Sequence, residues 1–175
     1  TDPGVEVEEY LELGKKNEVQ LYPGFDSHWE SGKDRLVPAK EWLAAWQRGL
    51  TKGYYDRGAH GIYIFNWHAT RNSHRHLLTT LGNSDTLAQT DKVYDPVYRF
   101  QRARSELRYG AEHDDRLYGE LPVGLYPTLT GCGPTFHLSV HDDVQAAAAS
   151  GDLAALELHI ELEHYSPADE VEVML

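Results

Sequence analysis

One segment constrains the fold of this chain more than any other: residues 54–68, which read YYDRGAHGIYIFNWH. After a turn punctuated by glycines, residues 62–65 are apolar or aromatic at consecutive positions. A strand that is apolar on both faces is typical of a parallel sheet covered by helices. The strand stops abruptly at Asn66, Trp67 and His68, whose side chains can hydrogen-bond to a ligand or stack on it. We therefore expect a buried parallel strand with a ligand-binding end.

The residues before this segment complete a βαβ unit. The sequence EVQLYPGF, residues 18–25, predicts a short apolar strand that Pro-Gly terminates. Residues 38–58 predict a helix, because their apolar positions recur at steps of three and four residues. Trp42 and Trp46 lie on this apolar stripe, and we expect both in the core. Strand, loop, helix and strand in this order are the parts of a βαβ unit. Two further helices are predicted, over residues 2–17 and about 84–105.

Beyond about residue 110 the apolar residues recur with period two. Residues 136–140 and 156–162 alternate apolar and polar side chains, as antiparallel strands with one buried face do. One short helix or helical turn is predicted between them, in HDDVQAAAASGDLA. We therefore predict two domains, one over residues 1–108 and one over 121–175, joined by a linker at 109–120. Neither has enough strands to close a core, and the chain starts without Met and ends in the strand-like EVEVML, so we expect a piece of a longer protein.

Composition narrows the class of partner. The formal net charge is −12 and the pI is near 5.2, so no basic stripe is present to neutralise nucleic-acid phosphates or to bind an anionic membrane surface. No apolar run approaches 18 residues, and no membrane-spanning helix is predicted. The one cysteine, Cys132, cannot form a disulfide within the chain. We expect a neutral or cationic small ligand, no nucleic acid and no membrane, and leave oligomeric state and localisation open, including a secreted or periplasmic location.

Several spaced segments together resemble one family. VQLYPGFDSHW, the tryptophan-bearing helix, YYDRGAHGIYIFNWH and LLTTLGNSDTLAQTDKVY resemble the closing portion of bacterial glycoside-hydrolase-like TIM-barrel proteins. In that family the last strand commonly reads like GADGIYLFNF and a segment like LGDPETLARLDK follows, which matches residues 81–92 here. The resemblance covers about residues 2–105, and the region after residue 120 is similar to the β-sandwich that follows the barrel. The fold class it implies is α/β plus β: the last βα units of a (β/α) TIM barrel, as a fragment, followed by an incomplete antiparallel β-sandwich. The implied barrel elements are the sixth helix at 5–17, the seventh strand at 19–25, the seventh helix at 38–57 and the eighth strand at 61–67.

The resemblance also implies a catalytic residue. Active sites of TIM barrels lie at the carboxyl ends of the strands, and glycosidic cleavage normally uses two carboxyl groups. Asp26 is nearest to the place of the seventh-strand carboxylate, where the family's clan usually has Glu; Glu30 lies four residues on. The second carboxylate would come from a fourth strand that is not in this chain, so we expect the chain alone to be inactive. The alternative for Asp26 is a turn residue that caps its own backbone.

Trp67 resembles the aromatic residue that lies under the sugar at the end of the eighth strand in that clan. A flat apolar ring matches the C–H face of a pyranose, whereas the alternative is a tryptophan that closes the core. No cofactor is implied. The remaining predicted substrate-binding residues follow the two strands or lie just before their ends: Tyr22, His28, Trp29, Asn66 and His68.

The ten histidines raise the question of a metal site. His74 and His76, with His68 nearby, form the best candidate group, but side chains two residues apart on a helix point apart, so we predict no metal. The alternative functions are a non-catalytic carbohydrate-binding barrel protein and, less favoured, a metal-dependent barrel hydrolase. Four other histidines are predicted at exposed positions of the sandwich: His137, His141, His159 and His164.

Overall fold

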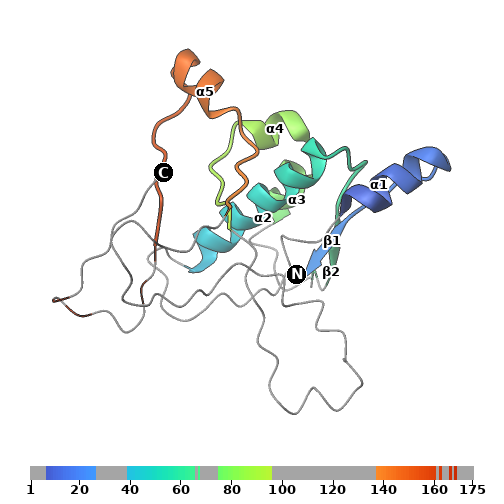
Figure 1. The fold of residues 1–175 in the computed structure, drawn as a ribbon, viewed down its shortest axis with the longest axis horizontal. Coiled ribbons are helices and arrows are strands. Elements are labelled where there is room, and N and C mark those ends of the chain that lie inside the picture. The colour runs from blue at the N-terminus through green and yellow to red at the C-terminus, as the bar shows by residue number, and fades with distance from the viewer. Residues whose placement is uncertain are drawn as a thin grey trace, which may run out of the picture. The chain divides into compact units, whose positions relative to one another are not determined.

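The computed structural model describes residues 7–26, 39–65, 67, 75–95, 137–160, 162, 166 and 168. Contacts divide the chain into two compact units, Thr1–Asp142 and Asp143–Leu175, and each is described by itself. The elements follow one another as α1 (Val7–Lys16), β1 (Gly24–Asp26), α2 (Ala39–Asp56), β2 (Tyr63–Phe65), α3 (Arg75–Leu81), α4 (Ser84–Ala88) and α5 (Val144–Ser150) (Figure 1). Within these residues, none of the helices is long and apolar enough to cross a bilayer.

The predicted βαβ unit is confirmed, but the prediction that its second strand is buried on both faces is wrong, because Tyr63 and Phe65 are 58% and 52% exposed. Strands β1 and β2 pair in parallel, with α2 between them in the sequence, and Gly24 lies opposite Tyr63. Ahead of the regular pairing, the Tyr63 N–H donates to the Pro23 carbonyl oxygen at 2.9 Å. The prediction of a strand over residues 18–25 that Pro-Gly terminates is wrong in its bounds, because β1 begins at Gly24, directly after Pro23, and residues 19–23 have irregular structure. Proline has no N–H to donate to a ladder, which fits its place ahead of the strand. The unit is therefore a short two-stranded sheet joined by a long helix.

Helix α2 carries the core of this unit. Trp46 and Phe25 are almost fully buried, and their rings meet edge to face with centroids 6.2 Å apart. On its other sides α2 packs against α3 and α4, which contribute Leu81 and Leu87 to the same cluster (Figure 1). Burial of each such side chain contributes about 1.5–3 kcal/mol. Trp46 is a core residue as predicted, whereas the side chain of Trp42 lies outside the described residues.

The segment after α4 lies directly on α2. The Val93 N–H donates to the Ala45 carbonyl oxygen at 3.0 Å, a bond from an irregular segment to a helix backbone. Gly49 makes this approach possible, because a Cβ atom there would come within 2.1 Å of the Val93 carbonyl oxygen. The predicted helix over 84–105 is correspondingly wrong in its length: α4 ends at Ala88, and residues 91–95 have irregular structure.

The prediction of a TIM-barrel fragment followed by an antiparallel β-sandwich is wrong. The described residues contain two parallel strands in one small sheet, and neither a barrel nor a sandwich forms among them. Residues 156–160 alternate apolar and polar side chains as predicted, yet pair with no strand in the described part, and Leu156 is 68% exposed. A period-two pattern specifies the two faces of a strand but supplies no partner, and a ladder needs both.

The short helix predicted between the alternating segments is confirmed as α5, whose first turn is capped by Asp143. Its side chain accepts a hydrogen bond from the Ala146 N–H at 2.9 Å, and Gly151 ends the helix in the left-handed conformation. The predicted linker at residues 109–120 lies outside the described residues, and the predicted domain limits stay predictions.

Candidate functional site

The first candidate site is the edge where β1 and β2 end. Asp26, the last residue of β1, pairs with Phe65, the last residue of β2. Both strands run in the same direction, so their carboxyl ends share one edge. In open parallel sheets, ligands bind outside the carboxyl ends of the strands. The register therefore brings the backbone of Asp26 beside Phe65, the residue that precedes Asn66–Trp67–His68 in the sequence.

Trp67 is the one described residue of that segment. Its side chain is partly buried and packs against the core cluster around Trp46. This contact is the one expected of a tryptophan that closes the core, and the stacking of its ring on a sugar stays a prediction. The other predicted site groups at this edge lie outside the described residues: the side chain of Asp26, and His28, Trp29, Asn66 and His68.

Tyr22 does not share the edge with Asp26. It precedes β1 and lies four residues before Asp26, about 13 Å along an extended chain. The Tyr22 ring lies on Gly61, where a Cβ atom would come within 2.5 Å of the Tyr22 Cε1 atom. Its hydroxyl group donates to the Gln20 Oε1 atom at 2.8 Å. Tyr22 therefore lies at the amino-terminal end of the strand pair, whereas the backbone of Asp26 lies at the carboxyl end.

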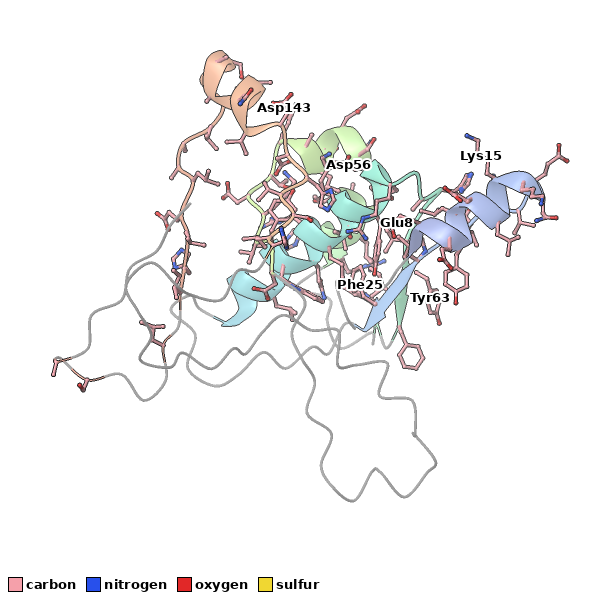
Figure 2. All side chains as sticks on the ribbon, in the orientation of Figure 1. Glu8, Lys15, Phe25, Asp56, Tyr63 and Asp143 are labelled. Carbon is pink, nitrogen blue, oxygen red and sulfur yellow. The ribbon has the colours of Figure 1, made fainter. Side chains whose placement is uncertain are left out.

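Two aromatic residues on the sheet were not predicted as site residues. Tyr63 and Phe65 are 58% and 52% exposed, and alternation places both on the face opposite Phe25 and Ile64. Figure 2 shows Tyr63 and the buried Phe25 on neighbouring strands. The pattern that could have identified them is visible in the sequence, because residues 63 and 65 are aromatic at alternate positions of one strand.

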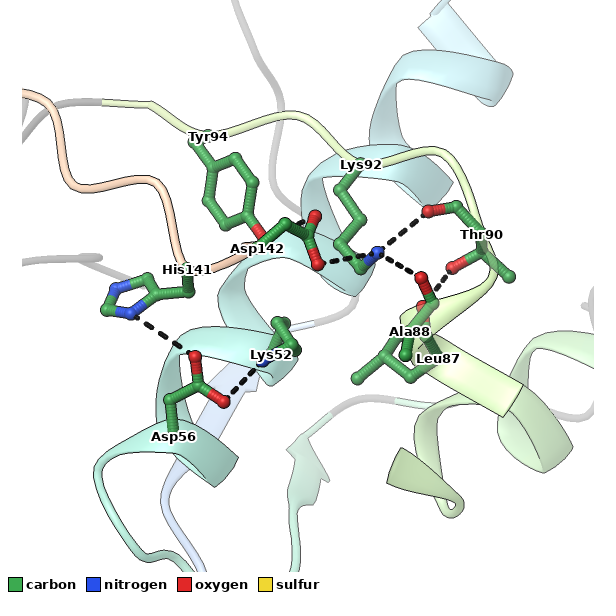
Figure 3. A network of polar contacts seen from close by, with 9 residues as sticks. All are labelled: Lys52, Asp56, Leu87, Ala88, Thr90, Lys92, Tyr94, His141 and Asp142. Carbon is green, nitrogen blue, oxygen red and sulfur yellow. Dashed lines mark hydrogen bonds and ion pairs between the residues drawn. The ribbon is translucent and has the colours of Figure 1, made fainter. Parts of the chain in front are cut away.

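A second group of polar residues gathers around Asp142, within the first unit. Lys92 is only 3% exposed, and its Nζ atom lies 3.1 Å from Asp142 Oδ1 and donates to the carbonyl oxygens of Thr90 and Ala88 at 2.8 and 3.3 Å (Figure 3). The Tyr94 hydroxyl donates to Asp142 Oδ2 at 2.9 Å. Burial and the neighbouring Asp142 carboxylate raise the pKa of the Tyr94 phenol. Asp142 thus accepts from one ammonium and one neutral hydroxyl group.

His141 lies beside this group and is not an exposed position, so that prediction is wrong. Its side chain is 20% exposed, because its ring packs where α2 has Gly53 instead of a larger residue. Nδ1 lies 3.8 Å from Asp56 Oδ2, and Nε2 lies 3.5 Å from the Arg57 NH2 group. Burial lowers the pKa of His141, and the positive charges of Arg57 and Lys52 lower it further.

Among the residues that the structure describes, neither site has a group of side chains that could bind a metal ion. Within the described residues, no three His, Cys, Asp or Glu side chains gather closely enough to hold an ion. His76 is exposed on α3, whereas His74 and His68 lie outside those residues. The sequence-based prediction of no metal stays a prediction.

No protein-family model, curated protein or solved structure matches this chain.

Proposed function

We propose that this chain binds a carbohydrate at the carboxyl edge of β1 and β2, and that Asp26 supplies one carboxylate for hydrolysis of an O-glycosyl bond. The observation that carries the proposal is the register of the two strands, which pairs Asp26 with Phe65. The acidic residue Asp26 is thereby the strand partner of Phe65, and Phe65 is 52% exposed.

The chemistry of a sugar suits such an edge. The C–H face of a pyranose packs on an aromatic ring, and carboxylate, amide and imidazole groups bond to its hydroxyl groups. Phe65 offers an exposed ring, while Asp26, Asn66 and His68 supply polar groups at the end of the same strands. The net charge of −12 is compatible with a neutral ligand of this kind.

Hydrolysis requires a second carboxyl group across the scissile bond. Of the described carboxylates, Asp56 lies beside Lys52 and His141, and Glu8 pairs with Arg57, so neither is free to act at the strand ends. We therefore expect catalysis only where a further carboxylate is supplied, and no glycoside turnover by this chain alone. The second candidate function is carbohydrate binding without catalysis, which needs no second carboxyl group.

The test is a titration of the chain with a panel of neutral mono- and oligosaccharides, in which calorimetry and the NMR signals of the backbone amides report binding. We expect saturable binding of at least one sugar, and Phe65→Ala should weaken it about tenfold, the equivalent of about 1.4 kcal/mol of stacking. Tyr10→Ala is the matched control, because Tyr10 is an equally exposed aromatic residue on α1.

Absence of saturable binding, or equal losses in the Phe65 and Tyr10 variants, would contradict the binding site. The catalytic role is tested separately with Asp26→Asn in a preparation that hydrolyses a glycoside. Loss of turnover with sugar binding retained is the expected result. Retained turnover would remove Asp26 from the mechanism and leave binding alone.

A further inference from the structure

We propose that His141 and Asp142 form a proton-sensitive clasp, which holds residues 137–142 on α2 while His141 is neutral and releases them when His141 is protonated. The clasp joins parts of the chain that are distant in sequence. Arg57 and His141 are 84 residues apart, and Tyr94 and Asp142 are 48 residues apart. Figure 3 shows Tyr94, His141 and Asp142 beside Lys52 and Asp56 in the second half of α2.

The contact between Arg57 and His141 depends on the protonation of the imidazole ring. A guanidinium group has hydrogen-bond donors and no acceptor, so it can bond to Nε2 only when that nitrogen carries no proton. The Arg57 NH2 group lies 3.5 Å from Nε2, and Glu8 on α1 holds the same guanidinium through Nε at 3.3 Å. Protonation of His141 would therefore place two donors, both positively charged, against each other.

The two acidic groups around the ring also have other partners. Asp56 is 3.8 Å from Nδ1, beyond hydrogen-bond length, and is bonded to Lys52. The carboxylate of Asp142 accepts from Tyr94 and Lys92. Asp56 and Asp142 favour the imidazolium form, but burial, Arg57 and Lys52 oppose it. The Tyr94 ring, centred 6.0 Å from the His141 ring, is uncharged at neutral pH.

The direction of the pH effect follows from this balance. The pKa of His141 in the folded chain is lowered from its ordinary 6.5, so folding favours the neutral ring. The stabilisation is complete above pH 6.5 and is lost as the pH falls below that value. Each unit by which the pKa is lowered changes the ratio of closed to open clasp up to tenfold in acid. His141 is therefore the group of the clasp that responds.

The experiment places a nitroxide spin label on residue 139, in a Ser139→Cys, Cys132→Ser background, and records the NMR signals of residues 50–57. Ser139 is exposed and two residues from His141, so a closed clasp brings the label close to α2 and broadens those signals. We expect broadening at about pH 7.5 and its loss at about pH 5, with a midpoint near or below the ordinary pKa of histidine. Equal broadening at both pH values would overturn the proposal.

Two variants and one control assign the effect. His141→Gln keeps an acceptor for Arg57 without a titrating group, and should stay closed at both pH values. The control is His159→Gln, at an exposed histidine of the second unit, which should behave as the parent chain. Arg57→Gln removes one opposing charge and leaves burial in place, so this variant should open less in acid than the parent chain even if the His141 variant does not dock. Opening of the His141 or the Arg57 variant at the same pH as the parent would refute the role of His141.

Discussion

Replacing Gly49 with alanine tests the close approach of residue 93 to α2. A Cβ atom at position 49 would lie 2.1 Å from the Val93 carbonyl oxygen and 3.0 Å from its carbonyl carbon. Ordinary van der Waals contacts of a Cβ atom begin at 3.4 Å, so the backbone of residue 93 must move by more than about 1 Å. The neighbour is main chain, and no side-chain rotation can relieve the overlap.

The expected change in stability combines three terms. Overpacking of this kind costs about 1–3 kcal/mol. Displacement of residue 93 also weakens the hydrogen bond from the Val93 N–H to the Ala45 carbonyl oxygen, worth about 1 kcal/mol. Alanine gains about 1 kcal/mol over glycine in helix propensity. The net loss is about 2 kcal/mol, which corresponds to a melting temperature lower by about 4–8 °C in a chain of this size.

Urea unfolding followed by circular dichroism measures this loss, and Gly53→Ala is the matched control. Gly53 lies one helical turn further along α2, but a Cβ atom there meets the His141 ring at 2.9 Å, and a side chain can rotate away. We expect Gly53→Ala to change global stability by less than about 1 kcal/mol and to open the clasp. If Gly49→Ala unfolds at the same urea concentration as the parent, or at a higher one, the packing of residue 93 on α2 is refuted.

Two further predictions concern a helix cap and a phenol. Asn83→Ala removes the acceptor for the Thr86 N–H at 2.9 Å and should lower the free energy of unfolding in urea by about 1 kcal/mol. Asp143→Ala removes the cap of α5 and should lower only the local helicity, because α5 has no buried residue. An equal global loss in both variants would contradict this difference. The raised pKa of Tyr94 means that its contribution to stability is complete below the ordinary value of 10.0 and is lost as the pH rises above it. Tyr94→Phe should therefore lower the free energy of unfolding by about 1 kcal/mol at neutral pH. Its melting temperature should fall less in alkali than that of the parent chain, and an equal fall in both would contradict the reasoning.

The sequence predicted the structure where the information is local. The helical spacing of apolar residues in α2 and the apolar run of β2 were enough to predict a parallel βαβ unit, and from it that Asp26 and the end of β2 share one edge. Residues 156–160 show the limit, because their alternation is correct for a strand but a partner strand is not encoded in the segment itself. The contacts of His141 were unpredictable for a related reason. Nothing near His141 in the chain indicates Arg57, and the glycine that admits its ring is in another element.

The length of chain that the clasp closes has a consequence for the order of folding. Bringing Asp142 to Tyr94 closes a loop of about 48 residues, which costs about 3 kcal/mol of chain entropy. The hydrogen bond to Tyr94, the ion pair to Lys92 and the contact of Arg57 with His141 return about 1 kcal/mol each. The entropic cost of closing the loop and the summed energy of the three contacts are nearly equal. We therefore expect these contacts to form after α2 has docked on its neighbours and to open while the rest stays folded. Substitutions at the clasp should then accelerate opening and unfolding and leave the rate of folding almost unchanged.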